Sequence, residues 1–348
     1  MEIKQVVSSY EWDKYIMNHE NAGFCHLFNW KNVIMDAYHH KSNYFAAIDS
    51  RTGRDEKICG ILPVYRFKRI YGKERLVSIP FFDSAGILAQ DKKVENFIFQ
   101  KAIEMCSLKN ISALELRQAG DLTIPDHKIW TADSQIYRGK VNLYLKITGS
   151  QQKMMKNFNS KLRNQICKGK KNSLSWKIGK QELVDQFYKV FSRNMRDLGS
   201  PVHSKKFFNS IFNYFYHNSF ICIIFFKSKP VAASFMFRFK KRLSNPWASS
   251  IREYRPLQTN MFLYWQMIRF ACNTGMEIFD MGRSSLGAST YRFKKQWGAE
   301  ERPLFWYRWV SENSSYTNQE TLSIDYWKKM PLGIANILGP MVRKNISL

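Results

Sequence analysis

The spacing of apolar and polar positions along the chain predicts two helices first and three strands next. Two amphipathic stretches, residues 12–19 and 30–38, predict helices. Three extended runs follow, separated by turn-prone segments at 50–56 and around Gly72, and they span residues 42–48, 57–67 and 75–81. Because short connections join successive strands, we expect antiparallel pairing between them.

The same order of elements occurs a second time further along the chain. The first pass continues with a helix over 94–106 and strands over 111–117 and 136–147. After a helical stretch at 152–169 and a short strand at 174–179, the second pass is predicted as helices over 182–195 and 205–216, strands over 220–226, 230–239 and 245–250, a helix over 260–275, a strand over 276–282, a short helix within 289–297 and a strand over 304–309. A period of roughly 150 to 170 residues indicates a duplicated domain rather than a solenoid repeat of about 20 to 50 residues. The sequence therefore predicts two similar α/β (α+β) domains, each a mostly antiparallel central sheet flanked by helices.

Charge is distributed unevenly between the two halves. The chain has 54 Lys and Arg against 28 Asp and Glu, a net charge of +26. Residues 1–148 hold 21 basic and 17 acidic side chains, whereas residues 149–348 hold 33 and 11. The excess positive charge of the second half favours an anionic partner. Nucleic acid, a phosphorylated sugar or lipid carrier, and an anionic membrane leaflet are the alternatives. The alternative is that the charge serves only solubility.

The cysteines and the apolar runs indicate in which cell compartment the protein is expected. Six cysteines lie far apart, without a CxxC pair or a Cys/His cluster at zinc spacing, which indicates a reducing compartment and no metal site. The N-terminal stretch lacks the apolar core of a signal peptide, and no apolar run approaches the ~18 residues of a membrane span. We therefore expect a cytoplasmic protein without a bound metal.

Polar residues follow the strand predicted at 276–282. Asp280 is expected to close this strand, Gly282 to permit a sharp turn, and Arg283 to enter a loop. Since the carboxyl ends of strands are where α/β sheets usually bind ligands, this loop is a candidate site. The competing interpretation is a glycine-containing turn in which Asp280 acts only as a cap.

Three cationic side chains alternate with three aromatic ones just beyond this loop, namely Tyr291, Arg292, Phe293, Lys294, Lys295 and Trp297. Fixed positive charge among flat apolar surfaces suits a phosphate or a developing oxyanion. A solvated basic face would explain the lysines equally well, but not their placement between aromatic residues.

Further basic residues are candidates for substrate binding. Residues 151–180 hold nine basic and no acidic side chains, and a helical conformation over this stretch is expected to bring Lys161, Arg163 and Lys168 near one face. Arg196 precedes a Gly-Ser-Pro turn, and Arg255 precedes Asn260 at a helix start. Arginine binds phosphate or carboxylate through two parallel hydrogen bonds. Solvated basic faces and surface ion pairs are the structural alternatives.

Residues 280–298, DMGRSSLGASTYRFKKQWG, followed by AEERPLFWYRW, resemble the closing signature of FemAB-related proteins associated with exosortase and PEP-CTERM systems. That pattern is D-F-G-R-S, G-T-G, F-K-x-x-W-G and P-L. The resemblance extends to WDKYIMNH with HLFNWKNVIMDAYHH, to LVSIPFFDSAGIL, SKLRNQICKGKKNSL and NMRDLGSPVHSKKFF, and to MPLGIANILGPMVRK, and so covers nearly the whole chain. It implies tandem GNAT-like domains over 1–145 and 146–312, the second with the active site, and a helical tail over 313–348.

The resemblance also implies an activity, which is transfer of an acyl or aminoacyl group to an amine. The wider Fem group uses aminoacyl-tRNA to modify peptidoglycan precursors, and the lysine of its Phe-Lys pair is thought to stabilise charge on the transferred carbonyl. That role falls to Lys294 by position, while Asp280 is one candidate proton acceptor beside the substrate and water. Arg283, Tyr291 and Trp297 are expected to contact substrate.

The chain departs from the family pattern at several places. Met281 stands where Phe is usual, Ala288 and Ser289 where Thr and Gly are usual, and the long coiled-coil insertion is missing. The stretch 283–287 misses the spacing of a coenzyme A pyrophosphate loop by one residue. The donor is therefore left open between aminoacyl-tRNA and acyl-CoA, and no bound cofactor is expected.

Taken together, these features predict an N-acyltransferase or aminoacyltransferase acting on an amine of a phosphorylated or lipid-linked cell-envelope or exopolysaccharide precursor. A non-catalytic scaffold for envelope assembly is the main alternative, and a nucleic-acid-binding protein is a further one. The apolar run in the tail, flanked by Lys328, Lys329, Arg343 and Lys344, is expected to lie either on the inner membrane face or against the protein's own surface.

Overall fold

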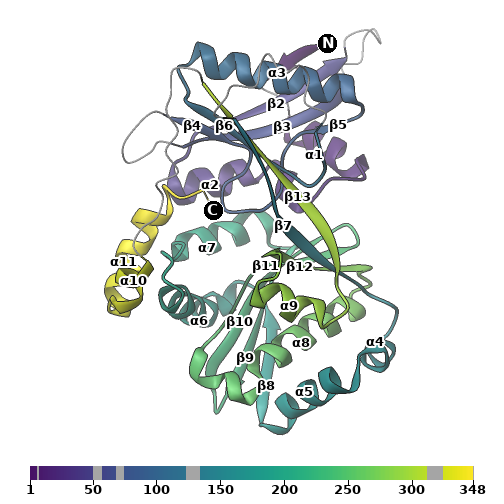
Figure 1. Ribbon diagram of the computed structural model, residues 1–348, viewed down its shortest axis with the longest axis vertical. Coiled ribbons are helices and arrows are strands. Elements are labelled where there is room, and N and C mark those ends of the chain that lie inside the picture. Colours follow the sequence, from purple (N-terminus) through teal and green to yellow (C-terminus); the bar gives the residue numbers. More distant parts are fainter. Residues whose placement is uncertain (6–7, 50–56, 68–73, 123–133, 312–323, 348) are drawn as a thin grey trace. The chain divides into compact units, whose positions relative to one another are not determined.

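The computed structural model describes residues 1–5, 8–49, 57–67, 74–122, 134–311 and 324–347 (Figure 1). The predicted turns at 50–56 and around Gly72 lie outside these residues. The chain divides into two compact units. Unit 1 comprises Met1–Lys140, Pro303–Glu320 and Asn345–Leu348, and unit 2 comprises Val141–Arg302 and Thr321–Lys344.

Unit 1 is a mostly antiparallel sheet with helices packed on it. Its elements are β1 (Glu2–Lys4), α1 (Ser9–Asn18), η1 (Phe24–His26), α2 (Trp30–Tyr38), β2 (Ser42–Asp49), β3 (Lys57–Phe67), β4 (Arg75–Val77), β5 (Leu88–Ala89), α3 (Lys92–Leu108), β6 (Ala113–Gln118), the first half of β7 (Gln135–Lys146) and most of β13 (Glu300–Val310). The strand order begins β1-β2-β3-β4-β6-β13, and β4–β6 is the parallel pair within it. Helix α3 lies so close to β3 that a Cβ added at Gly60 would be 2.7 Å from Ile98 and Val94.

A buried ion-pair cluster joins β6 to its neighbours in unit 1. Arg117 is fully buried, and its Nη2 donates to Glu115 Oε1 at 2.7 Å. Burial alone would raise the pKa of Glu115, but the charges of Arg117, Arg75 and Arg308 hold it below its usual value. Arg117 also donates to the carbonyl of Ile79, so its guanidinium has both a carboxylate and a backbone carbonyl as hydrogen-bond partners.

Unit 2 has a sheet of the same kind, with helices on both faces. Its elements are the rest of β7, α4 (Gln151–Asn157), α5 (Ser160–Lys171), β8 (Leu174–Gly179), η3 (Gln181–Leu183), α6 (Val184–Asp197), α7 (Lys205–Phe215), β9 (Ser219–Phe226), β10 (Lys229–Phe239), β11 (Arg242–Ser250), η4 (Arg252–Leu257), α8 (Thr259–Asn273), β12 (Ile278–Ser285), α9 (Ser289–Lys295), α10 (Ile324–Lys329) and α11 (Leu332–Arg343). The strand order is β7-β12-β11-β10-β9-β8, and β11–β12 is parallel whereas β8–β9, β9–β10 and β10–β11 are antiparallel. The predicted α/β class, with mostly antiparallel sheets flanked by helices, is confirmed.

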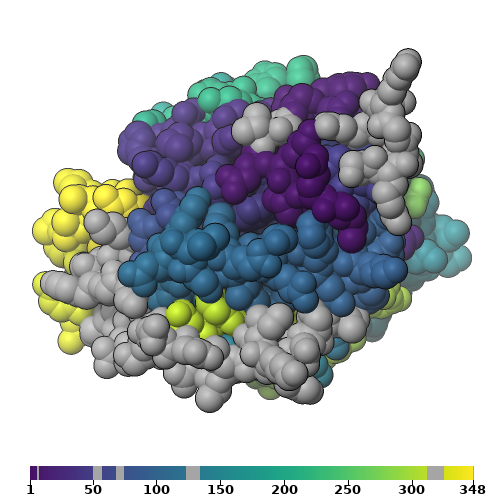
Figure 2. Space-filling model, turned by 90° about the horizontal axis from the view of Figure 1, so that it is seen from above, coloured from purple at the N-terminus to yellow at the C-terminus, as the bar shows by residue number. Residues whose placement is uncertain are grey.

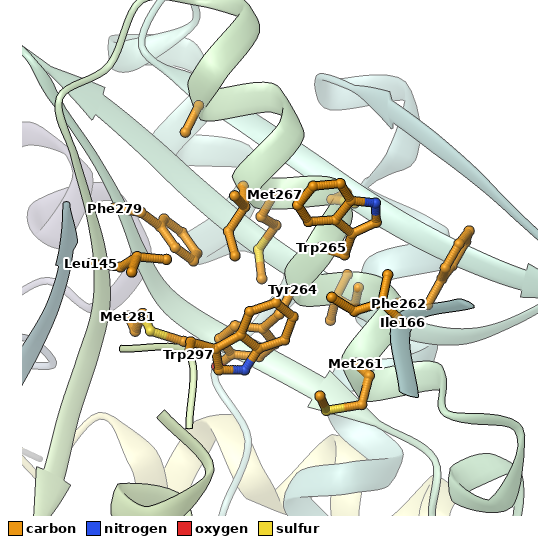
Figure 3. Packing of buried hydrophobic residues seen from close by; sticks show 14 of the residues in the cluster. Leu145, Ile166, Met261, Phe262, Tyr264, Trp265, Met267, Phe279, Met281 and Trp297 are labelled. Atoms are coloured by element: carbon orange, nitrogen blue, oxygen red, sulfur yellow. The ribbon is translucent and has the colours of Figure 1, made fainter. Parts of the chain in front are cut away.

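Alternation along β10 directs side chains to two cores. The ring of Phe235 lies 5.6 Å from that of Phe208 on α7, whereas Met236 belongs to the cluster beneath α4, α5 and α8. Figure 3 shows this second cluster, in which the rings of Tyr264 and Trp297 lie 6.2 Å apart. Among the described helices, none is long and apolar enough to span a bilayer.

The two units are not the consecutive ranges 1–145 and 146–312. The division falls inside β7 and inside β13, so residues 303–310 of β13 belong to unit 1. Tyr307 and Trp309 explain this, because both pack in the core of unit 1, whereas Trp297 packs in the core of unit 2. The described part of the expected tail 313–348 forms α10 and α11, which pack on α6 in unit 2.

Candidate functional site

The predicted loop after Gly282 is in fact a continuation of the strand. Strand β12 runs to Ser285, so Asp280 lies within it and does not close it. Gly282 has φ +74°, a conformation that costs glycine little, and this bends the strand without ending it. The expectation of a sharp turn followed by a loop at Arg283 is therefore wrong.

Strands β11 and β12 separate toward their carboxyl ends. They pair in parallel from Arg242 with Ile278 to Ser244 with Asp280, and these two fully described strands form no further pairs beyond that point. The edge of an α/β sheet at which neighbouring parallel strands end is a common position for a ligand. The separation of β11 and β12 is therefore the candidate site.

Asp280 shapes the backbone at this separation. Its carboxylate is largely buried, and Oδ1 accepts a hydrogen bond from the Gly282 amide at 2.9 Å. Ser244 Oγ on β11 donates to Oδ2 at 3.4 Å. A carboxylate that bonds the amide two residues later stabilises a local bend. Asp280 therefore holds Gly282 in its left-handed conformation.

Lys294 on α9 contacts the same bend. Its side chain is only 7% exposed, and Nζ donates to the carbonyls of Gly282 at 2.9 Å and Arg283 at 2.8 Å. Gly282 fits here because it has no side chain. An added Cβ would lie 3.2 Å from the Asn245 carbonyl and 3.9 Å from Lys294 Nζ. The result is an ammonium group fixed at the point where β11 and β12 separate.

Several buried polar groups near this point were not identified from the sequence as site residues. Ser234 Oγ donates to Asn245 Oδ1 at 2.5 Å between β10 and β11. The hydroxyls of Ser284 on β12 and Thr259 at the start of α8 are buried, and neither has a hydrogen-bond partner among the described residues. Small polar residues within apolar strands are the signal that could have indicated two of them, Ser234 in VAASFMF and Asn245 in LSNPWASS. Buried polar groups of this kind are available to a bound ligand.

The aromatic residues around Lys294 do not form a cage. Trp297 is 1% exposed, and its ring lies 5.4 Å from Phe158 and 6.2 Å from Tyr264, inside the core. Its expected contact with substrate does not fit this position. Tyr291 is half-buried, and its hydroxyl donates to Glu301 Oε1 at 2.6 Å. These aromatic residues position α9, which carries Lys294.

Arg163 faces a different part of unit 2. It lines a cleft of about 1230 Å³ between α4, α5, β8 and α8, together with Lys156, Lys170 and Arg269. The described lining holds no acidic side chain, and its apolar wall includes Phe262 and Trp265 on α8. Arg163 Nη1 donates to the Phe158 carbonyl at 2.7 Å, which orients the guanidinium. Lys161 is exposed on the same helix but does not line the cleft.

The remaining candidates are dispersed. Arg196 Nε pairs with Asp197 at 2.7 Å, and its Nη1 donates to the Met330 carbonyl at 3.2 Å, so it connects α6 to the segment between α10 and α11. Arg255 is exposed on η4, and Asn260 is half-buried in the first turn of α8. The structure thus brings Asp280, Arg283 and Lys294 together, and separates them from Arg196.

Comparison with known proteins agrees with this geometry. Residues 156–295 match the model of the family described as acetyltransferase (GNAT) domain. No curated protein matches the chain. Among solved structures, FemX superposes with a TM-score of 0.68 at 11% identity, over 89% of this chain and 98% of that one. L-PGS from Bacillus licheniformis gives a TM-score of 0.57 at 10% identity, over 100% of both chains. A tandem GNAT protein from the clavulanic acid biosynthesis pathway gives 0.55 at 8% identity, over 90% of this chain and 99% of that one. The chain therefore has a tandem GNAT-like fold, and unit 2 contains a GNAT domain.

Proposed function

We propose that unit 2 transfers an acyl or aminoacyl group to an amine of a phosphorylated or lipid-linked precursor of the cell envelope or of an exopolysaccharide. The observation that carries this proposal is the buried ammonium of Lys294, which is fixed where β11 and β12 separate in a GNAT-like domain. A cation held in a site of low dielectric stabilises charge that develops on a carbonyl oxygen. We further propose that the chain is a FemAB-related protein of the exosortase and PEP-CTERM group.

The proposed step is attack of the acceptor amine on the carbonyl carbon of an activated ester or thioester. A C–N bond forms, the carbonyl oxygen becomes an oxyanion, and Lys294 stabilises its charge. The oxyanion then collapses, the bond to the donor oxygen or sulfur breaks, and the amine proton passes to an acceptor. Asp280 is one such acceptor, and a second role for it is to maintain the bend at Gly282.

The residues present do not favour coenzyme A as the carrier of the acyl group. The segment between β11 and α8, residues 251–258, holds no glycine and forms the 3-10 helix η4, with Pro256 inside it. A pyrophosphate needs close approach of backbone amides, which glycine usually permits. We therefore propose an aminoacyl ester as the donor, and assign no step to coenzyme A.

The cationic cleft beside α5 is consistent with a phosphorylated acceptor. Arg163, Lys156, Lys170 and Arg269 supply positive charge there, and Phe262 and Trp265 supply apolar surface. Phosphate groups and an apolar or ring-containing portion would both find partners in such a cleft. We propose that this cleft holds the acceptor, with Lys161 contributing to the field at its edge.

A second candidate function is a non-catalytic protein of envelope assembly. One observation favours it, because Lys294 already directs two of its donors to backbone carbonyls, as a purely structural lysine would. Nucleic-acid binding explains the charge of the second half alone, and no feature of the candidate site adds support for it.

The test is mass spectrometry of lipid-linked and polysaccharide fractions from cells with and without the gene. We expect an acylated or aminoacylated species that disappears without the gene and returns with the wild type. Lys294→Ala should fail to restore it, whereas Lys295→Ala should restore it fully, because Lys295 is exposed and pairs with Glu301 at 3.4 Å. Restoration by a stably folded Lys294→Ala variant would support the non-catalytic candidate, and no difference between the fractions would exclude the transferase.

A further inference from the structure

Helix α11 exposes large apolar side chains and buries small ones. Its exposed residues include Ile334, Ile337, Leu338 and Met341, with exposed fractions of 48%, 69%, 40% and 59%. Their spacing is i, i+3, i+4 and i+7, which places them along one stripe about 100° wide. The opposite face buries Ala335 and Gly339. A helix that only covered its own domain would have the reverse arrangement.

The outward direction of this stripe is fixed by contacts within unit 2. Gly339 lies so close to the loop before α7 that an added Cβ would be 2.9 Å from the Val202 side chain. At one end of the helix, Arg196 binds the Met330 carbonyl, and at the other Arg343 Nε lies 3.2 Å from His203 Nε2. The stripe is therefore presented by a docked helix (yellow in Figures 1 and 2).

Positive charge flanks the stripe at both ends. Lys328 and Lys329 on α10 and Lys344 just after α11 are exposed. The acidic side chain in 324–344 is Asp325, which lies 3.7 Å from Lys328. At 12 residues, α11 is about 18 Å long, which suits a helix lying in the plane of a membrane interface and not one crossing it.

We propose that α10 and α11 dock unit 2 on an anionic phospholipid surface, with the apolar stripe in the headgroup region and the three lysines on lipid phosphates. A second copy of the chain is the other occupant that an apolar face could have. A two-fold contact through this stripe would, however, bring the same lysines toward one another, and like charges at close range are repulsive. The docking is independent of the chemistry proposed for Lys294.

The experiment is co-sedimentation of the purified full chain with vesicles of phosphatidylglycerol and phosphatidylcholine, and with vesicles of phosphatidylcholine alone, at low and high salt. We expect binding to the anionic vesicles that weakens at high salt. Ile337→Asp should lower the partition coefficient at least tenfold, because it places a charge in the stripe. Replacing Lys328 and Lys329 by Gln should lower it roughly thirtyfold for anionic vesicles.

Controls separate docking from folding and from self-association. Leu108→Asp is a matched change at an 87% exposed leucine on α3, and it should leave binding unchanged. Thermal unfolding of Ile337→Asp should match the wild type, since that side chain is mostly exposed. Equal binding by Ile337→Asp and wild type, or no binding to anionic vesicles, would overturn the proposal. So would light scattering that shows a wild-type dimer and an Ile337→Asp monomer, because a second copy would then cover the stripe.

Discussion

Replacing Gly282 by alanine tests whether the bend in β12 fits between β11 and Lys294 as described. Gly282 and Gly287 share φ +74°, but a Cβ at Gly287 would meet nothing within 4 Å, whereas one at Gly282 would lie 3.2 Å from the Asn245 carbonyl. An alanine at positive φ costs about 1 to 2 kcal/mol in either place. At Gly282 the close contact adds about 1 to 3 kcal/mol, because packed backbone must move.

Chemical denaturation with urea measures both costs on one scale. We expect Gly287→Ala to lower the free energy of unfolding by about 1 to 2 kcal/mol, and Gly282→Ala by about 2 to 5 kcal/mol. Gly282→Ala should also reduce the amount of acylated product in complemented cells at least tenfold, since the carbonyls that hold Lys294 would shift. Equal losses of stability for the two variants would refute the packing of Gly282 against Asn245. Full product from Gly282→Ala would refute the need for a fixed Lys294.

Three further predictions concern buried groups. Glu115→Gln should lower the free energy of unfolding at pH 7 by about 3 to 5 kcal/mol, because Arg117 would remain buried without its charge partner. The pKa of Glu115 is lowered in the folded protein, so the ion pair stabilises the wild type above about pH 4.5 and this stabilisation is lost as the pH falls below that value. The Gln variant should not show this loss. Burial and the nearby Arg343 hold the pKa of His203 well below 6.5 in the folded protein, so on acidification His203 takes up a proton in the unfolded chain before it does so in the folded one. The urea midpoint of the wild type should therefore fall more between pH 7.5 and 5.5 than the midpoint of His203→Phe. A maleimide should label exposed Cys167 in the native protein before Cys222, whose thiol is fully buried with a raised pKa, as peptide mass spectrometry would show; equal labelling would contradict the described core.

The distribution of apolar residues predicted most elements of the fold. The helices over 182–195 and 205–216 follow from apolar spacing along one face, and the strands over 220–226 and 230–239 follow from short, nearly continuous apolar runs, which suit strands buried on both faces. The division into units did not follow from it, since nothing local marks where β13 passes from one core to another. Trp297 and Trp309 are equally apolar residues, and only the packed cores assign them to unit 2 and unit 1.

The candidate site was predicted in part. Lys294, Asp280 and Arg283 do lie together, but the bend at Gly282 was interpreted as a turn because glycine after an apolar strand usually ends it. Basic residues were the least predictable, since charge carries no periodic signal. Arg163 proved to line a cleft, whereas Arg196 pairs with Asp197. The role of each residue depends on neighbours that are distant in sequence.

The placement of β13 in unit 1 has a consequence for synthesis on the ribosome. Strand β6 pairs with β13, and the Leu122 amide binds the Tyr307 hydroxyl across 185 residues of sequence. At about 5 to 20 residues per second, the ribosome needs roughly 10 to 40 s to supply that partner. Until then the first unit to emerge has an open strand edge, which is a site for wrong pairing with other chains. The sheet of the N-terminal unit is therefore completed only after strands β8 to β12 of unit 2 have been made, and chaperones that cover strand edges should associate with nascent chains that end between β6 and β13.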